Sequence, residues 1–340
     1  MEEEITLEEY IENYNTAIYN LYPKFFDYLN YINMSANNIN WLGEQLFKDD
    51  IKIDDYSDYI DNVEMFDLAS NIVESLGADY LKKFKKSFID GTFDFYEADD
   101  NSFAYTRFNN NHFDVSVDCQ YNVEDVMKLV HEFFHCLHIE RFDDKLEDEN
   151  CYIYTELFAL VGELYAILYL YKNNFHKHDV CQYFKRFIRV MYYYANEILI
   201  QGFAMHVYDT CRSFDETSLN DYFNLTGIPE DFAILFDFLD DIDDFDFHEK
   251  ATYILGFFPA YLIAQLMIDD DNAIVKFKKC IVSIKDYIQI EDLYAYFNID
   301  SLINSNSALA KLSDDIYEDV SELLNNDRIV YHKKIGETWS

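Results

Sequence analysis

Residues 122–138 read NVEDVMKLVHEFFHCLH, and this stretch has the features of an amphipathic helix. Asn122 is a favourable N-cap residue, and Glu124 and Asp125 fall in the first turn, where negative charge stabilises the helix dipole. Apolar residues then recur at intervals of three and four along one face: Val123, Met127, Val130, Phe134 and Leu137. The spacing predicts a helix that starts at Val123 and ends near Phe142.

A segment with a different period precedes this helix, between Ser102 and Asp118. Its second half places apolar side chains at alternate positions: Phe113, Val115 and Val117. A period of two is typical of a strand with one buried face. Because the asparagines at 109–111 form a polar tip between two such stretches, the sequence predicts a half-buried β-hairpin.

The remainder of the chain reads as helical. Helical patterns occur around residues 6–21, 37–48 and 58–90, and a very apolar helix is expected over residues 151–171. Gly (8) and Pro (3) are scarce, which argues against a turn-rich β architecture. We therefore expect a mainly α fold with a small β hairpin or sheet before the helix that starts at residue 123.

The composition limits the classes of function. The 340 residues are 50% hydrophobic, which is enough for a large core and excludes general disorder. Lys and Arg number 26 against 65 Asp and Glu, for a formal net charge of −39. Because a chain this acidic repels phosphate backbones, we do not expect nucleic acid as a partner.

The cysteines and the first residues bear on location. The six cysteines are widely spaced and include no CxxC pair. The chain opens with MEEEITLEEY, which has neither the basic start nor the apolar core of a signal peptide. These features predict reduced thiols and a cytoplasmic protein.

Residues 251–268, ATYILGFFPAYLIAQLMI, contain no charge and approach the length of a membrane-spanning helix. Gly256, Pro259 and Gln265 interrupt the run, and three aspartates follow it at 269–271. No cluster of Lys and Arg anchors either end. The pattern favours a buried core helix over a membrane span, so we expect no membrane as a partner.

Residues 131–135, HEFFH, form a motif with a specific chemistry. Positions four apart share one face of a helix, so His131 and His135 can direct ring nitrogens at one metal ion. Glu132 lies about 100° around the helix from His131, where it suits a water molecule held by the metal. Zinc is the natural occupant, because it accepts nitrogen and oxygen ligands and leaves one position open.

Two carboxylates interrupt the apolar helix that follows. Glu156 and Glu163 lie on one face of YTELFALVGELYAILYL, and burying them unpaired would cost several kcal/mol each. A metal on the preceding helix would compensate that cost. We therefore predict Glu156 as the third ligand, with Glu163 orienting a ligand imidazole from behind. The alternative is an accidental HExxH, with both glutamates capping or pairing with Lys and Arg.

With these residues the chain resembles the thimet oligopeptidase and oligopeptidase F family of zinc metallopeptidases, in which glutamate is the third ligand (gluzincins). Three segments carry the likeness: HEFFHCLH (131–138), TELFALVGE (155–163) and YILGFFPAYLIA (253–264). The resemblance implies a mostly helical peptidase with a deep cleft, one zinc ion per chain, and short, unstructured peptides as substrates. It also implies that residues 1–90 form a reduced N-terminal helical lobe and residues 91–340 the catalytic region.

The chain departs from that family's pattern in several places. Phe134 stands where such proteins usually have glycine, and no Pro-Ser-Gln follows Glu156. The loop between the two helices is also shorter. In that family an enclosed channel limits the substrates to small peptides. A chain with a reduced N-terminal lobe is not expected to enclose such a channel fully.

The resemblance also assigns the reacting groups. Glu132 would act as general base, accepting a proton from the attacking water and returning it to the leaving amine. Tyr253 matches a tyrosine of the family's donor helix and is expected to stabilise the oxyanion, with His248 as a second candidate beside it. Lys250 stands where the family has another tyrosine. The alternative, that Tyr253 packs in the core and His248 lies on the surface, stays open.

His138 shares the helix face of His131 and His135, and the family has a histidine there too. A fourth protein ligand would close the site and stop catalysis. We therefore predict that His138 supports the site from outside the ligand set, or is simply packed.

Three functions fit the sequence. The first is a zinc endopeptidase whose peptide substrates lie extended along the hairpin edge, with basic or neutral peptides preferred over acidic ones. The second is a catalytically silent zinc-binding module of the same fold that binds peptides. The third, a helical scaffold or membrane-associated acidic protein, rests on residues 251–268 alone.

Overall fold

The computed structural model describes residues 28–47, 54–97, 104–109, 112–139, 149–209, 247–283 and 290–337. The helices in these ranges are α3 (Leu29–Phe47), α4 (Asn62–Leu76), α5 (Ala78–Ile89), α6 (Val123–Ile139), α7 (Glu149–Lys172), α8 (Lys177–Asp209), α11 (Phe247–Asp269), α12 (Asp271–Ser283), α13 (Ile290–Phe297), α14 (Asp300–Ile303) and α15 (Asn306–Glu337). The strands are β1 (Phe93–Glu97), β2 (Ala104–Asn109) and β3 (His112–Cys119). The prediction of a mainly α fold with a small sheet before α6 is confirmed.

The three strands form one sheet in the order β1-β3-β2. β2 and β3 pair antiparallel from Asn109↔His112 to Ala104↔Val117, which is the expected hairpin. β1 pairs parallel to β3, with Phe93 opposite Val115, and this strand was not anticipated. Its five residues, FDFYE, are too short for a clear alternation, and its partner is not the next strand in sequence. β2 is thus an edge strand among the described residues.

The start of α6 follows the predicted cap. The Asn122 side chain accepts a hydrogen bond of 2.8 Å from the Glu124 amide. The Asp125 carboxylate accepts bonds from the Gln120 and Asn122 amides at 3.0 Å and 3.2 Å, which satisfies further backbone donors at this end. These bonds fix the junction between the sheet and α6, so the hairpin and the HEFFH segment keep a defined relation.

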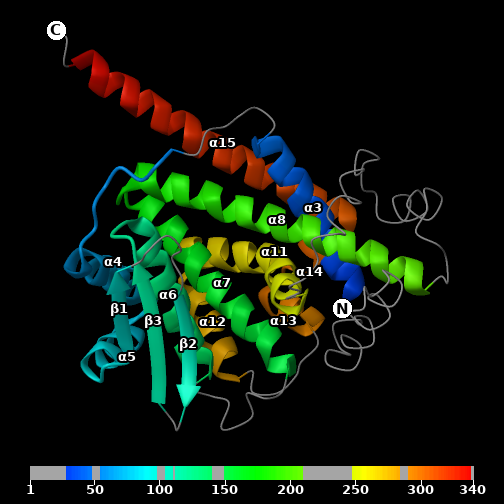
Figure 1. Ribbon diagram of the computed structural model, residues 1–340, viewed down its shortest axis with the longest axis horizontal. Helices are drawn as coiled ribbons and strands as arrows, with labels where there is room; N and C mark the ends of the chain where they lie inside the picture. Colours follow the sequence, from blue (N-terminus) through cyan, green and yellow to red (C-terminus); the bar gives the residue numbers. More distant parts are fainter. Residues whose placement is uncertain are drawn as a thin grey trace, which may run out of the picture.

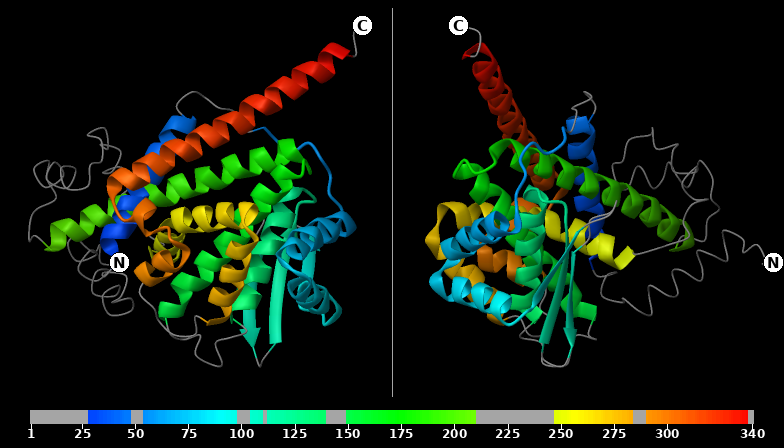
Figure 2. Two further views of the ribbon diagram at one scale, coloured as in Figure 1. Left: turned by 180° about the vertical axis from the view of Figure 1, so that it is seen from behind. Right: turned by 60° about the vertical axis from the view of Figure 1, so that its left-hand side comes forward.

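Figure 1 shows α6, α7 and α11 at the centre of the molecule, with α8 and α15 running along one side. The sheet lies at one end beside α4 and α5, as the views in Figure 2 also show. The Phe88 ring of α5 stacks on Phe93 of β1 with ring centroids 4.7 Å apart, and Phe84 contacts Phe133 of α6 at 5.0 Å. Aromatic packing therefore connects α5 both to the sheet and to α6.

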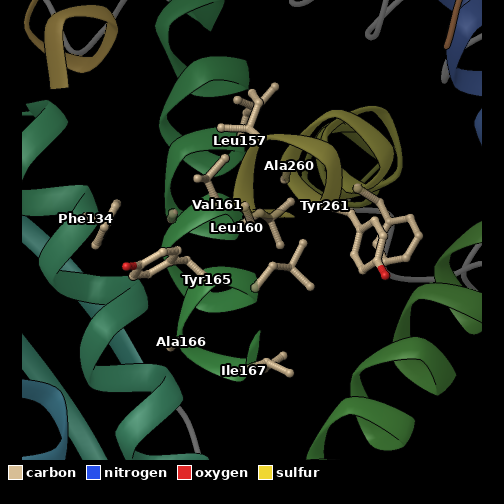
Figure 3. Packing of buried hydrophobic residues seen from close by; sticks show 14 of the residues in the cluster. Phe134, Leu157, Leu160, Val161, Tyr165, Ala166, Ile167, Ala260 and Tyr261 are labelled. Atoms are coloured by element: carbon tan, nitrogen blue, oxygen red, sulfur yellow. The ribbon is translucent and has the colours of Figure 1, made fainter. Parts of the chain in front are cut away.

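The packing of α6 on α7 explains how the chain accommodates Phe134 at a position where the resembling family usually has glycine. A Cβ added at Gly162 of α7 would lie 2.6 Å from the Phe134 ring. The glycine therefore makes the room that the large side chain on α6 needs. The opposite face of α7 presents Leu157 and Leu160 toward α11 and its Ala260 (Figure 3).

α11 contains the uncharged run 251–268, for which the sequence favours a buried core helix over a membrane span. By length and composition its segment Lys250–Asp269 is able to span a membrane, but 78% of the apolar window is buried inside the protein. Gly256 lies against Leu160 of α7, and the Tyr261 hydroxyl donates to Asp319 of α15 at 2.9 Å. This burial is what the core helix of a globular domain shows.

The N-terminal patterns are partly visible. The pattern around residues 37–48 lies largely within α3, and that at 58–90 corresponds to α4 and α5, which meet at Gly77 with φ of 133°. The pattern at 6–21 lies outside the described residues. α3 packs on α8, α11 and α15, so it contacts helices from the remainder of the chain.

Candidate metal centre

Three buried side chains from two helices meet at one point. His131 and His135 come from α6 and Glu156 from α7, and one ligand atom from each lies within 4.8 Å of the others. The two Nε2 atoms are 3.1 Å apart. The Glu156 carboxylate lies 3.7 Å from Nε2 of His131 and 3.5 Å from Nε2 of His135. The structure thus brings together the three predicted ligands.

The electrostatics of this cluster are unusual for buried groups. Burial by itself lowers the pKa of His131, but Glu156 and Glu163 raise it well above its ordinary value. For His135 burial prevails, and its pKa falls. Burial would raise the pKa of Glu156, yet the two imidazoles and the Tyr253 hydroxyl outweigh it and lower the value to about 2. Glu156 is therefore ionised and faces two imidazoles. A carboxylate must be ionised to bind a metal.

The residues fit a zinc ion. Oε2 of Glu156 is buried and has no hydrogen-bond partner among the residues that the structure describes. Nδ1 of His131 faces Glu163, so in the neutral ring that nitrogen carries the proton and Nε2 presents a lone pair to the cluster. A divalent cation between these atoms would satisfy the converging lone pairs, and two imidazoles with one carboxylate are a ligand set that zinc accepts with a fourth position open.

Glu163 lies where the sequence predicted it. Its Oε2 is 2.7 Å from Nδ1 of His131, on the side of the ring away from the cluster. Its other oxygen, Oε1, accepts a hydrogen bond of 2.6 Å from the hydroxyl of Tyr183 on α8. Burial and the neighbouring Glu163 raise the pKa of Tyr183 well above its ordinary value, so the phenol stays protonated. Sequence reasoning missed Tyr183, which is one of thirty tyrosines and has no motif of its own.

Glu132 is held from the sheet. Its buried carboxylate accepts a hydrogen bond of 2.6 Å from the Thr106 hydroxyl on β2. Its negative charge helps to raise the pKa of His131 and opposes the fall in the pKa of His135, so it lies beside the cluster. Thr106 was also missed, because the direction of a side chain on β2 depends on a register that the sequence does not give.

Tyr253 of α11 lies against the cluster, as the resemblance implied. Its hydroxyl is one of the groups that lower the pKa of the Glu156 carboxyl. Its ring lies parallel to that of His131 with centroids 6.4 Å apart, and it meets Tyr194 edge to face at 5.8 Å. The Tyr253 side chain is only partly buried.

Two further predicted residues have different outcomes. His248 belongs to α11, but its side chain is outside the described residues, so its role stays a prediction. His138 does not join the ligand group: its Nδ1 lies 3.1 Å from the Thr155 hydroxyl, and its ring meets Phe158 edge to face at 4.7 Å. Because Thr155 directly precedes Glu156 in α7, His138 packs against α7 next to the predicted ligand. Lys250 of α11 forms an ion pair with Glu197 of α8.

No protein-family model matches the chain, and no curated protein matches its sequence. Two solved structures resemble its fold. The first, assigned as a peptidase from Chlamydophila abortus, has a TM-score of 0.59 and 15% identity over 91% of this chain and 57% of that one. The second, assigned as an oligoendopeptidase F from Bacillus anthracis, has a TM-score of 0.52 and 11% identity over 77% of this chain and 46% of that one. The chain spans about half the length of these proteins and shares their helical fold.

Proposed function

We propose that the protein is a zinc metallopeptidase that hydrolyses peptide bonds in short or unstructured peptides. One observation carries the proposal: the buried His131, His135 and Glu156 converge on one point, with Glu132 beside them. The likeness in fold to proteins assigned as a peptidase and an oligoendopeptidase F supports it, as does the resemblance of the HEFFHCLH segment to the thimet oligopeptidase and oligopeptidase F family.

In this proposal His131, His135 and Glu156 hold one zinc ion. When bound there, zinc lowers the pKa of a coordinated water to about 7 and polarises the scissile carbonyl. Glu163 is not a ligand. It accepts a hydrogen bond from Nδ1–H of His131, which keeps the proton on Nδ1 and leaves Nε2 unprotonated toward the metal.

Glu132 is the general base. It accepts a proton from the attacking water and returns it to the amine of the leaving peptide. The Thr106 hydroxyl, 2.6 Å from Oε2 of Glu132, restricts rotation of the carboxylate and leaves the other oxygen to accept the proton. One hydrogen bond therefore joins the proposed general base Glu132 to strand β2.

Tyr253 is the donor to the oxyanion that forms as water adds to the carbonyl. Its hydroxyl contributes to the lowered pKa of Glu156, so it lies near the predicted ligand. Preorganised donors of this kind account for a large share of the rate enhancement in acyl transfer. His248 remains the second candidate for this role.

The substrate is expected to bind along β2. β2 is paired only with β3 among the described strands, and Thr106 on it contacts the general base. A peptide added as a further strand would use main-chain hydrogen bonds, which suit unstructured peptides of varied sequence. The net charge of −39 favours basic or neutral peptides over acidic ones, which a comparison of kcat/KM for Lys-rich and Glu-rich peptides of equal length would test.

The decisive experiment combines metal analysis with a quenched-fluorescence peptide library, using wild type and Glu132→Gln. We expect about one zinc per chain in both proteins and turnover only in wild type. Glu74→Gln, the same change on the exposed face of α4, is the matched control and should retain turnover. Absence of zinc would refute the proposal, whereas zinc without turnover in wild type would favour a silent zinc-binding module of the same fold.

A further inference from the structure

Three buried side chains form a continuous chain of hydrogen bonds behind the metal centre. The Tyr183 hydroxyl of α8 donates to Oε1 of Glu163 on α7 at 2.6 Å. Oε2 of the same carboxylate is 2.7 Å from Nδ1 of His131 on α6. The chain therefore links three helices and ends on one of the ligand imidazoles.

The second imidazole has no such support. Nδ1 of His135 is buried and has no hydrogen-bond partner within the part of the chain that the structure describes. A carboxylate behind a histidine fixes the tautomer and the ring orientation, and it increases the basicity of the nitrogen that binds the metal. His131 has this support and His135 lacks it, so the orientation of the site depends on Glu163.

Glu163 needs a second partner to perform this role. The terminal torsion of a glutamate is broad, so one hydrogen bond alone leaves the carboxylate free to turn. The Tyr183 hydroxyl holds Oε1, and Oε2 is then directed at His131. Tyr183 is itself confined, with 8% of its surface exposed, by the packing of α8 on α7.

We infer that Tyr183 is a positioning residue of the metal centre, which acts through Glu163 to fix the ring of His131. The inference rests on the proposed zinc site and deepens it. If Tyr183 only contributed to the core, its hydroxyl would matter for stability and leave metal affinity unchanged. Metal affinity therefore distinguishes the two roles.

The test is the zinc affinity of metal-stripped Tyr183→Phe, measured by competition with a chromophoric chelator. Loss of a group that supports a ligand typically lowers affinity about 10–100-fold, and we expect a loss near the lower end because Tyr183 acts through one intermediate residue. Tyr165→Phe is the matched control, because Tyr165 is also a buried tyrosine, and its hydroxyl on α7 bonds to Ser75 at 2.8 Å instead of Glu163. The control should lose stability and keep its zinc affinity.

A double-mutant cycle with Glu163→Gln makes the test specific. Once Glu163 is replaced, Tyr183→Phe should cause no further loss of affinity, because both changes interrupt the same chain. Equal zinc affinity in wild type and Tyr183→Phe, or an additive loss in the double variant, would overturn the inference while leaving the zinc site intact. A wild type that binds no zinc would instead overturn the proposed function and the inference with it.

Discussion

α7 and α11 are both long, apolar helices packed against each other at the centre of the molecule, and they differ in one respect. α7 carries Glu156 and Glu163 in its buried interior, whereas α11 has no charged residue between Lys250 and Asp269. Buried carboxylates require compensating partners. In α7 those partners are the two imidazoles of α6 and the hydroxyl groups of Tyr183 and Tyr253.

The difference shows that α7 and α11 contribute differently to the cluster and the core. α7 places charges where a metal can use them, and its remaining residues form the core around them. α11 supplies an apolar surface, and among its described side chains Tyr253 presents a hydroxyl to the cluster. Apolar composition alone would make α11 a membrane candidate and α7 a core helix, but burial shows that both are core helices.

Replacing Glu156 should remove the defining feature of α7. We expect Glu156→Gln to lower zinc affinity by more than the roughly 100-fold that loss of a supporting group causes, and to reduce turnover to background. Zinc at 100 times its dissociation constant should stabilise wild type by about 2.7 kcal/mol and leave this variant unchanged, which thermal unfolding with and without zinc would measure. A variant that is stabilised by zinc as much as wild type would exclude Glu156 as a ligand.

Replacing Tyr253 tests the proposed contribution of α11 to the chemistry. Tyr253→Phe should lower kcat by about 100-fold, the effect of losing one oxyanion donor, while zinc stays bound. Steady-state kinetics and metal analysis on the same preparation would separate the two effects. Tyr261→Phe, two turns further along α11 and bonded to Asp319, is the control that should keep its kcat. Unchanged kcat in Tyr253→Phe would leave His248 as the candidate donor.

The charges of α7 also predict how the metal-free protein responds to pH. Because the pKa of His131 is raised in the fold, its contribution to stability is present below its ordinary value of 6.5 and is lost as the pH rises through the folded value. The pKa of Glu156 is lowered from 4.5 to about 2, so its contribution is present above 4.5 and is lost between these values as the pH falls.

Zinc binding should therefore release about one proton at pH 7, from His131, because a ligand imidazole must be neutral. Calorimetry in buffers with different ionisation enthalpies measures this number. Glu163→Gln should release fewer protons, because it removes one of the carboxylates that raise the pKa of His131. Release of no proton by wild type would show that His131 is already neutral in the metal-free protein.

The clustering of His131, His135 and Glu156 and the start of α6 could be predicted because they depend on local patterns. His131 and His135 share a face by helical spacing, and the Asn122 cap precedes an apolar stripe. Glu156 and Glu163 were identified because a carboxylate in an apolar helix needs a partner. Each of these signals lies within one element of secondary structure.

The contacts that hold the site could not be predicted in the same way. Thr106 reaches Glu132 only through the register of β2, and Tyr183 reaches Glu163 only through the packing of α8 on α7. β1 was missed because its pairing with β3 is parallel and not between consecutive strands. All three depend on tertiary packing between segments whose sequences contain no matching signal.

The smallest expected effect concerns the glycines of the two helices. A Cβ at Gly162 of α7 would lie 2.6 Å from the buried ring of Phe134, whereas a Cβ at Gly256 of α11 would lie 3.0 Å from the terminal methyl of Leu160. Alanine gains about 1 kcal/mol over glycine in a helix, and overpacking costs about 1–3 kcal/mol. Gly162→Ala should therefore lower the free energy of unfolding by about 1 kcal/mol, and Gly256→Ala should leave it nearly unchanged because the methyl group can move aside. Denaturant unfolding of both variants measures the difference, and equal stabilities would mean that α6 and α7 can separate as easily as the Leu160 side chain can turn.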